Sequence, residues 1–183
     1  MTPSLAWVGL GSNLDDPHEH VERALQELDE LPLTRCRQRS SRYRSRPVGP
    51  ADQPDFVNAV ALLETRLSPL ALLDQLQALE QRHGRVRQRR WGPRTLDLDL
   101  LLFDNLSLST PRLTLPHAQM TRRGFVLLPL AEVAPDLRLP DGQRIDELLA
   151  ALDTSDLRKV LPKSPQRLDE CHLSTPGHSS GNN

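Results

Sequence analysis

The chain has 183 residues and a formal net charge of −1, with 23 basic residues against 24 acidic ones. This length suits one domain that buries its core without cross-links. No apolar run approaches the roughly 18 residues of a membrane span, and no charged segment followed by an apolar one resembles a signal peptide, so we expect neither a membrane protein nor an exported one.

The first part of the chain predicts a strand, a helix and a second strand. Residues 5–11, LAWVGLG, form a continuous apolar run that stops at glycine, as a buried strand does. Asp16 is placed as the N-cap of an amphipathic helix over 17–31, with Glu19 as its capping-box partner. The polar, arginine-studded stretch 34–46 predicts a partly exposed strand.

The middle of the chain alternates loops with regular elements. Residues 47–55 carry three prolines and one glycine, which predicts a loop. A strand is expected over 56–65, and a helix over 68–84 that starts with Ser-Pro and stops at glycine. Residues 85–94 predict a second loop, which leads into a strand over 95–103.

The last elements complete a recognisable order. Short strands are expected around 106–109 and 112–115, followed by helices over 119–133 and 144–152. The main elements then read β-α-β-β-α-β, which predicts an α+β, ferredoxin-like core: an antiparallel sheet covered by helices.

The domain is expected to span residues 1–160. Residues 161–183 are rich in Pro, Ser, Gly and Asn, which predicts a disordered C-terminal tail. Cys36 and Cys171 lie in unrelated segments, with no C-x-x-C and no histidines at ligand spacing. They are interpreted as reduced thiols of a cytoplasmic protein.

Two aspartates interrupt the leucine-rich strand TLDLDLLLF. Strict alternation divides it into one face with Leu96, Leu98, Leu100 and Leu102 and another with Thr95, Asp97, Asp99, Leu101 and Phe103. Asp97 and Asp99 would then lie about 7 Å apart on one face. Neighbouring buried carboxylates repel, and a divalent cation such as Mg²⁺ resolves the conflict. Exposure of this face to water, or pairing with arginines, is the alternative.

Arginines and a tryptophan precede this strand. The arginines of this loop are Arg85, Arg87, Arg89, Arg90 and Arg94. A guanidinium group binds a phosphate with two parallel hydrogen bonds. Together with Mg²⁺, such groups neutralise the charge of a transferring phosphoryl group. Trp91 in such a loop either stacks on a flat ring or anchors the loop by packing.

Further polar residues lie on either side of the strand. Gln77 and Glu80 are one helical turn apart and either reach a nucleotide or form a solvated helix face. His117 follows a proline, and Arg123 precedes Gly-Phe; for a lone histidine a structural or exposed role is the usual one.

Several segments together resemble the 6-hydroxymethyl-7,8-dihydropterin pyrophosphokinase family of the folate pathway. The segment RWGPRTLDLDLLLF is very similar to the motif of that family, and GLGSNL, RSRPVGPADQPDFVNAV, LEQRHGRVR and LPHAQMTRRGFVLLPLAEVAPD agree in order and spacing. The resemblance covers roughly residues 5–152. It implies transfer of the pyrophosphoryl group of ATP to the hydroxymethyl group of a reduced pterin, with release of AMP.

The resemblance also implies a role for individual residues. Asp97 and Asp99 would be the ligands of two Mg²⁺ ions, and Arg85 and Arg94 would act on the phosphates. The nucleotide contacts would be Gln77, Glu80, Arg87, Arg90, Trp91, His117 and Arg123. The pterin contacts would be Ser45, Pro47, Val48, Phe56, Asn58, Trp91 and Phe125, with the rings of Trp91 and Phe125 on the two sides of the pterin.

The sequence departs from the family pattern at Arg46, Phe56, Ala118 and Thr121. Two other functions stay open from the residues alone: a nucleotidyltransferase, which would release pyrophosphate instead of AMP, and an RNA-binding module with an arginine-rich sheet. We expect ATP and a pterin as the partners of a monomer, with neither nucleic acid nor membrane as a partner.

Overall fold

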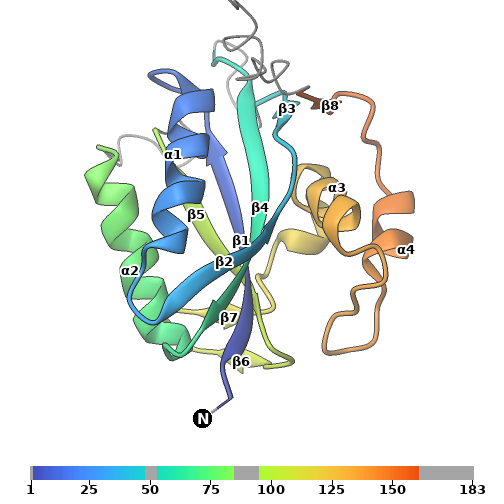
Figure 1. Ribbon diagram of the computed structural model, residues 1–183. Coiled ribbons are helices and arrows are strands. Elements are labelled where there is room, and N and C mark those ends of the chain that lie inside the picture. Colours follow the sequence, from blue (N-terminus) through green and yellow to red (C-terminus); the bar gives the residue numbers. More distant parts are fainter. Residues whose placement is uncertain (1, 48–52, 85–94, 161–183) are drawn as a thin grey trace, which may run out of the picture.

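A central sheet organises the computed structural model, which describes residues 2–47, 53–84 and 95–160 (Figure 1). Its strands are β1 (Ser4–Ser12), β2 (Thr34–Arg39), β3 (Tyr43–Ser45), β4 (Phe56–Thr65), β5 (Asp97–Phe103) and β8 (Arg158–Lys159). Their order is β5-β1-β4-β3-β8, and β2 also pairs with β4. Every pairing is antiparallel, which confirms the predicted fold class.

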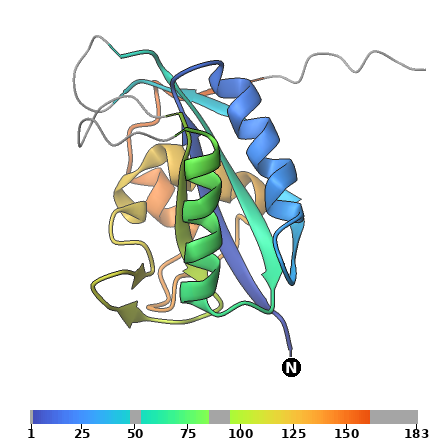
Figure 2. The same cartoon turned by 90° about the vertical axis from the view of Figure 1, so that its left-hand side faces the viewer.

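Helices cover the two faces of the sheet differently. Helices α1 (Pro17–Asp29) and α2 (Pro69–Arg82) lie on one face, and α3 (Gly124–Val133) and α4 (Ile145–Ala150) on the other (Figures 1 and 2). A short hairpin of β6 (Leu108–Ser109) and β7 (Thr114–Leu115) extends from β5. None of the helices in the described ranges is long and apolar enough to cross a membrane.

Each face of the sheet has its own apolar core. Under α1 and α2 the core is built mainly from leucine, valine and alanine, with Leu28, Leu72 and Leu76 fully buried. Under α3 and α4 it contains Trp7, Met120 and further aliphatic side chains. Each fully buried leucine contributes about 1.5–3 kcal/mol, so both layers are held to the sheet mainly by apolar burial.

The predicted helix starts are confirmed. The Asp16 carboxylate accepts a hydrogen bond from the backbone N–H of Glu19, and the Ser68 hydroxyl accepts one from that of Ala71. Both helices begin at the proline that follows the cap, where a missing N–H costs nothing. The first helix ends at Asp29, two residues before the predicted end.

Residues 34–46 form two strands instead of the predicted one. β2 pairs with the C-terminal half of β4 and β3 with its N-terminal half. Between them the Ser40 hydroxyl accepts a hydrogen bond from the backbone N–H of Val60 at 2.9 Å, and the Ser40 N–H donates to the Val60 carbonyl. These bonds satisfy β4 where the ladder is interrupted, so the chain can bend there.

Two further corrections concern the second half of the chain. The helix expected over 119–133 is a 3-10 turn, Met120–Arg122, followed by α3, with Arg123 extended between them. In β5 the predicted alternation fails beyond Leu100, because Trp7 pairs with Leu102 while the next residue of β1, Val8, pairs with Leu100. Leu101 is the extra residue of a bulge, so Leu102 joins Leu101 on the α3 side.

Candidate active site

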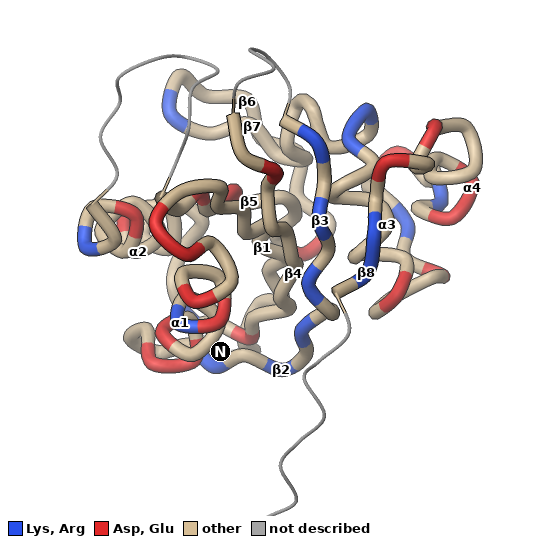
Figure 3. Tube along the Cα trace, turned by 90° about the horizontal axis from the view of Figure 1, so that it is seen from above, with Lys and Arg blue, Asp and Glu red and all other residues tan. Residues whose placement is uncertain are grey.

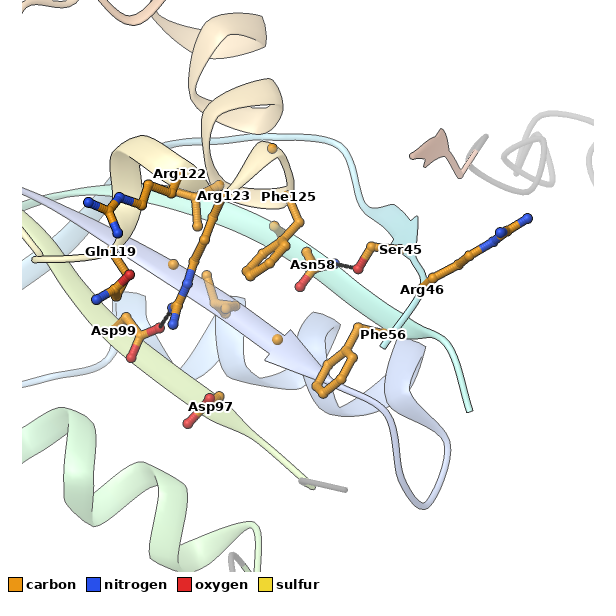
Figure 4. A pocket seen from close by; sticks show the side chains of 16 residues that line it. Ser45, Arg46, Phe56, Asn58, Asp97, Asp99, Gln119, Arg122, Arg123 and Phe125 are labelled. Carbon is orange, nitrogen blue, oxygen red and sulfur yellow. Dashed lines mark hydrogen bonds and ion pairs between the residues drawn. The ribbon is translucent and has the colours of Figure 1, made fainter. Parts of the chain in front are cut away.

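A cavity of about 440 Å³ opens on the α3 side of the sheet, where the layer of α3 and α4 stops short (Figure 4). Its walls come from β1, β3, β4, β5, the 3-10 turn and the start of α3. The lining residues are Gly9, Leu10, Gly11, Ser45, Arg46, Phe56, Asn58, Ala59, Asp97, Asp99, Gln119, Arg122, Arg123, Gly124, Phe125 and Val126. The cavity thus joins residues that are far apart in the sequence.

Two glycines of β1 form the floor of the cavity beside the aspartates. Gly9 is paired with Asp99 and Gly11 with Asp97. A Cβ on Gly11 would come within 3.2 Å of the Asn58 Oδ1, so even an alanine is tight there. Glycine in a strand leaves space for another molecule to approach the backbone. The sequence predicted no role for these residues, because their position opposite the aspartates is visible only in the strand register.

Asp97 and Asp99 project from β5 into the same cavity, as alternation predicted (Figure 4). The Arg123 guanidinium lies 3.8 Å from the Asp99 carboxylate and 5.6 Å from the centre of the Phe125 ring. Arginine pairing, which the sequence left open as an alternative, is therefore present at Asp99. A half-buried arginine held by one carboxylate and one ring provides a positive charge at the cavity wall.

The donor set of the cavity suits Mg²⁺ more than a transition metal. Both candidate ligands are carboxylates, which Mg²⁺ prefers, and Mg²⁺ commonly takes one or two of them and leaves its other positions to water and phosphate. Among residues 2–47, 53–84 and 95–160, no group of three or more His, Cys, Asp or Glu side chains could hold a metal ion by itself. The fit is to a cation that a ligand helps to hold.

The opposite end of the cavity combines an amide with aromatic rings. Asn58 and Ser45 are both buried, and the Asn58 Nδ2 donates to the Ser45 Oγ at 2.7 Å. The half-buried rings of Phe56 and Phe125 lie on either side of Asn58 (Figure 4). With its Nδ2 so engaged, Asn58 keeps its carbonyl oxygen for a further donor. This end can recognise a flat polar ring.

Asn13 and Gln53 support this end of the cavity and were missed by the sequence analysis. The Asn13 Nδ2 lies 3.3 Å from the Gln53 Oε1 and donates to the Pro54 carbonyl at 3.1 Å. Asn13 and Gln53 are buried. They join the end of β1 to the segment that leads into β4. In the sequence, the signal for them was an amide residue in each of the segments SNL and DQPD.

Gln77, Glu80 and His117 do not line the cavity. Glu80 is only 4% exposed, and its carboxylate accepts a hydrogen bond from the backbone N–H of Leu98, between the two aspartates. The solvated helix face considered for it is therefore wrong, because α2 packs against β5. Gln77 accepts a bond from Arg112 at 3.4 Å, and Arg112 also pairs with Asp74 at 2.6 Å.

His117 is tied to β5 by its backbone. Its N–H donates to the Leu101 carbonyl at 2.9 Å, and its Nδ1 accepts from the Gln119 N–H at 3.2 Å. Burial lowers the pKa of His117, Arg123 lowers it further, and Asp97 opposes these effects. The imidazole is therefore neutral at pH 7 and lies close enough to Arg123 and to Asp97 to feel the charge of each.

Of the remaining predicted site residues, Pro47 is half-buried at the end of β3. Val48, Arg85, Arg87, Arg90, Trp91 and Arg94 lie outside the described residues. Trp91, which was expected on the side of the pterin opposite to Phe125, is therefore not described. Three residues line the cavity although no role was predicted for them: Arg46, Gln119 and Arg122. For Arg122 the sequence offered a signal, because it stands beside Arg123 just before the Gly-Phe dipeptide.

The chain matches the family described as 7,8-dihydro-6-hydroxymethylpterin-pyrophosphokinase over residues 7–135. It is 59% identical over 154 residues to a 2-amino-4-hydroxy-6-hydroxymethyldihydropteridine pyrophosphokinase of Pseudomonas aeruginosa, covering 84% of this chain and 95% of the relative. It is 51% identical over 157 residues to the Haemophilus influenzae protein of the same name, covering 86% of this chain and 98% of the relative.

Solved structures agree on the fold. A crystal structure of HPPK-DHPS in complex with substrates superposes with a TM-score of 0.67 at 13% identity, over 87% of this chain and 47% of the solved one. Plasmodium falciparum HPPK-DHPS with pteroate gives 0.66 at 14% identity, over 81% of this chain and 42% of that one. The chain thus spans less than half the length of these solved chains. On the family match and the two relatives, the chain belongs to the 7,8-dihydro-6-hydroxymethylpterin-pyrophosphokinase family.

Proposed function

We propose that the cavity is the site where this diphosphokinase transfers the pyrophosphoryl group of ATP to the hydroxymethyl group of 6-hydroxymethyl-7,8-dihydropterin, a step of folate biosynthesis. The observation that supports this most is the division of one cavity into two ends: two carboxylates above a glycine floor at one end, and Asn58, Ser45 and two phenylalanines at the other. A triphosphate and a pterin need these two environments side by side.

The pterin is proposed to bind at the Asn58 end. Its ring system carries a row of amino, amide and ring-nitrogen groups along one edge, and the Asn58 carbonyl oxygen can accept from that edge. Phe125 is proposed to cover one face of the pterin ring and Phe56 to border it, since both side chains lie beside Asn58 (Figure 4). Ser45 holds the Asn58 amide in one orientation. Pro47 is a further proposed contact, as are Val48 and Trp91, which lie outside the described residues.

Asp97 and Asp99 are proposed to hold two Mg²⁺ ions that accompany the triphosphate. When bound, these ions withdraw negative charge from the phosphates and so make the phosphorus atom easier to attack. Asp97 and Asp99 would hold these ions, and Gly9 and Gly11 leave the floor beside them clear of side chains for the phosphate chain. Glu80 acts from behind β5: by accepting the Leu98 N–H it fixes the backbone between the two aspartates. Its proposed nucleotide contact, like those of Gln77 and His117, rests on the family resemblance.

Arg123 is proposed to exchange Asp99 for phosphate. Its separation of 3.8 Å from Asp99 is longer than a charge-assisted hydrogen bond, which measures about 2.7–2.9 Å. The guanidinium is therefore available to a phosphate oxygen while Phe125 keeps it in place. The family resemblance supports further phosphate or nucleotide contacts, which lie outside the described residues: Arg85, Arg87, Arg90 and Arg94.

The reaction needs no nucleophile from the protein. The hydroxymethyl oxygen of the pterin attacks the β-phosphorus of ATP and forms a new P–O bond. The bond between that phosphorus and the oxygen bridging to the α-phosphorus breaks, AMP leaves, and the hydroxyl proton is released. Catalysis then consists of positioning the two substrates and neutralising charge. Because the two ends of the cavity lie on one sheet, the sheet can hold both substrates in place.

The proposal extends to the state of the protein. We propose a cytoplasmic monomer whose catalytic unit spans residues 1–160, with ATP and the reduced pterin as its only required partners. The tail proposed for 161–183 lies outside the described residues.

The test is to incubate the protein with Mg-ATP and 6-hydroxymethyl-7,8-dihydropterin and to identify the nucleotide product. We expect AMP in equal amount to the pterin diphosphate; free pyrophosphate would instead mean nucleotidyl transfer. Asp97→Asn and Asp99→Asn should each lower kcat/KM by about 1,000-fold while the thermal midpoint stays within a few degrees. Asp136→Asn, which alters an exposed aspartate paired with Arg144, is the matched control and should stay fully active.

A further inference from the structure

The last described segment, residues 154–160, runs along the outer side of the cavity, and we call it the strap. It lies beyond the family match, which ends at residue 135. The segment contains β8 and follows α4 on the side of α3 and β3 (Figure 1). Its side chains are mostly exposed, with Thr154, Leu157 and Val160 half-buried. A mostly exposed segment contributes little to closing a core, so its contacts require another explanation.

On one side the strap is bonded to β3 and the residue after it. Arg158 pairs with Arg44 and Lys159 with Tyr43, and the Val160 N–H donates to the Arg42 carbonyl at 2.8 Å. The Asp156 carboxylate accepts a hydrogen bond from the backbone N–H of Arg46 at 3.3 Å. β3 provides Ser45 to the cavity, and Arg46 lines it as well. The strap therefore fixes one cavity wall from outside.

On the other side the strap packs against the start of α3. A Cβ built on Gly124 would lie 3.2 Å from both the Leu157 Cδ1 and the Thr154 Cγ2, so these side chains cover Gly124 closely. Gly124 is followed by Phe125, and both line the cavity. The Lys159 ammonium also lies 3.0 Å from the carboxylate of Glu132, further along α3. The strap therefore also contacts the wall that carries the Phe125 ring.

We propose that the strap sets the distance between the Ser45 wall and the Phe125 wall, and that Asp156 and Leu157 are positioning residues for the pterin. This deepens the proposed function and depends on it, because it assigns the Asn58 end of the cavity to the pterin. Neither residue contacts the cavity itself. They act through the Arg46 backbone and through Gly124, one on each wall.

The geometry predicts which ligand is affected. Asn58 comes from β4 and Asp97 and Asp99 from β5, and the strap contacts neither of these strands by any described hydrogen bond or pairing. Loosening the strap therefore changes how Phe125 and Ser45 close on a flat ring, while the carboxylate end keeps its shape. Pterin affinity should fall and nucleotide affinity should not.

The experiment measures binding of the two ligands separately in the full-length protein. The dissociation constant of 6-hydroxymethylpterin is followed by its fluorescence and that of Mg-ATP by calorimetry, for the parent, Asp156→Ala, Asp156→Asn and Leu157→Ala. We expect a rise of about 3- to 10-fold for the pterin in both alanine variants, the range of one lost hydrogen bond or contact, with Mg-ATP unchanged. Asp156→Asn should recover most of the affinity, because its side-chain oxygen still accepts the Arg46 N–H.

Asp141→Ala is the matched control, since Asp141 also accepts one backbone N–H, that of Gln143, at the surface. It should leave both constants unchanged. Unchanged pterin affinity in Asp156→Ala and Leu157→Ala, or an equal loss for both ligands, would overturn the proposal. A parent that binds the pterin but forms no AMP would contradict the proposed function and leave the strap result valid.

Discussion

The two faces of the sheet are built from the same strands and do different work. On the α1 and α2 face, β1 contributes Ala6, Val8 and Leu10, all buried in one continuous apolar core. On the other face, the alternate residues of β1 begin with Trp7 and continue with Gly9 and Gly11. The first face is closed along its whole length, whereas the second is closed only where Trp7 meets α3 and α4, and it opens where the glycines begin.

Along a single strand, alternate residues therefore contribute either to the stability of the closed core or to the candidate site on the open face. Seen from above, acidic residues dominate the helices, above all α1, and basic residues lie mainly along β2, β3 and β8 (Figure 3), whereas Asp97 and Asp99 lie inside the cavity on the open face. β5 repeats the pattern of β1, with Leu98 and Leu100 in the closed core between and after the two aspartates. A strand with a period of two can serve a core and a site at once, and this comparison can be tested one residue at a time.

The largest effect is expected from filling the floor of the open face. Gly11→Val places a branched side chain where a Cβ alone comes within 3.2 Å of the Asn58 Oδ1. We expect kcat/KM to fall by about 100-fold or more, because displacement of bound reactants by about 1 Å has such effects. Urea unfolding should show a loss of about 1–3 kcal/mol, the usual cost of overpacking, with the protein still folded. A stable variant with normal kinetics would show that the floor is not used.

Truncating the neighbouring residue should have the opposite result. Leu10 is 3% exposed and belongs to the closed core. Leu10→Ala should lower the free energy of unfolding by about 2–5 kcal/mol, while the kcat of the folded fraction stays within about 2-fold of the parent. Leu10 also lines the cavity. A large loss of kcat at temperatures well below the unfolding midpoint would therefore mean that the two faces are not independent.

Local patterns in the sequence predicted most of the fold. The helices α1 and α2 follow from apolar periodicity and from the Asp-Pro and Ser-Pro starts, which act within a few residues. The division of 34–46 into two strands depends on Ser40 meeting Val60, twenty residues away. The bulge at Leu101 depends on how β5 is paired with β1. Such features result from pairing between distant segments, which no local pattern encodes.

The candidate site shows the same limit. Alternation correctly placed Asp97 and Asp99 on one face, because it is a property of β5 alone. Gly9 and Gly11 gained a meaning only from their register with those aspartates. The burial of Glu80 against the Leu98 N–H follows from the packing of α2 on β5, which a helical wheel does not give. A charged side chain that is buried because it hydrogen-bonds to the backbone of another element, as Glu80 does, is the hardest to identify from sequence.

A smaller effect is expected where the open face is tied together. The buried Tyr43 hydroxyl donates to the Glu132 carboxylate at 2.6 Å, which joins β3 to α3 behind the cavity. Burial raises the pKa of Tyr43, and Glu132 raises it further. Tyr43→Phe should lower the free energy of unfolding by about 1.5–3 kcal/mol at pH 7, the range for a hydrogen bond to a charged group.

This loss should depend on pH in a defined direction. Burial acts to raise the pKa of Glu132, but hydrogen bonds from Tyr43, Ser41 and Lys159 outweigh it, so the pKa lies below its ordinary value of 4.5. The ionised carboxylate therefore stabilises the fold fully above that value and progressively less as the pH falls through the lowered pKa. Urea unfolding of the parent and Tyr43→Phe should differ most above about pH 5 and converge in acid. A difference that is constant from pH 7 down to pH 3 would mean that the hydroxyl contributes by packing, and that the tie between β3 and α3 does not depend on the charge of Glu132.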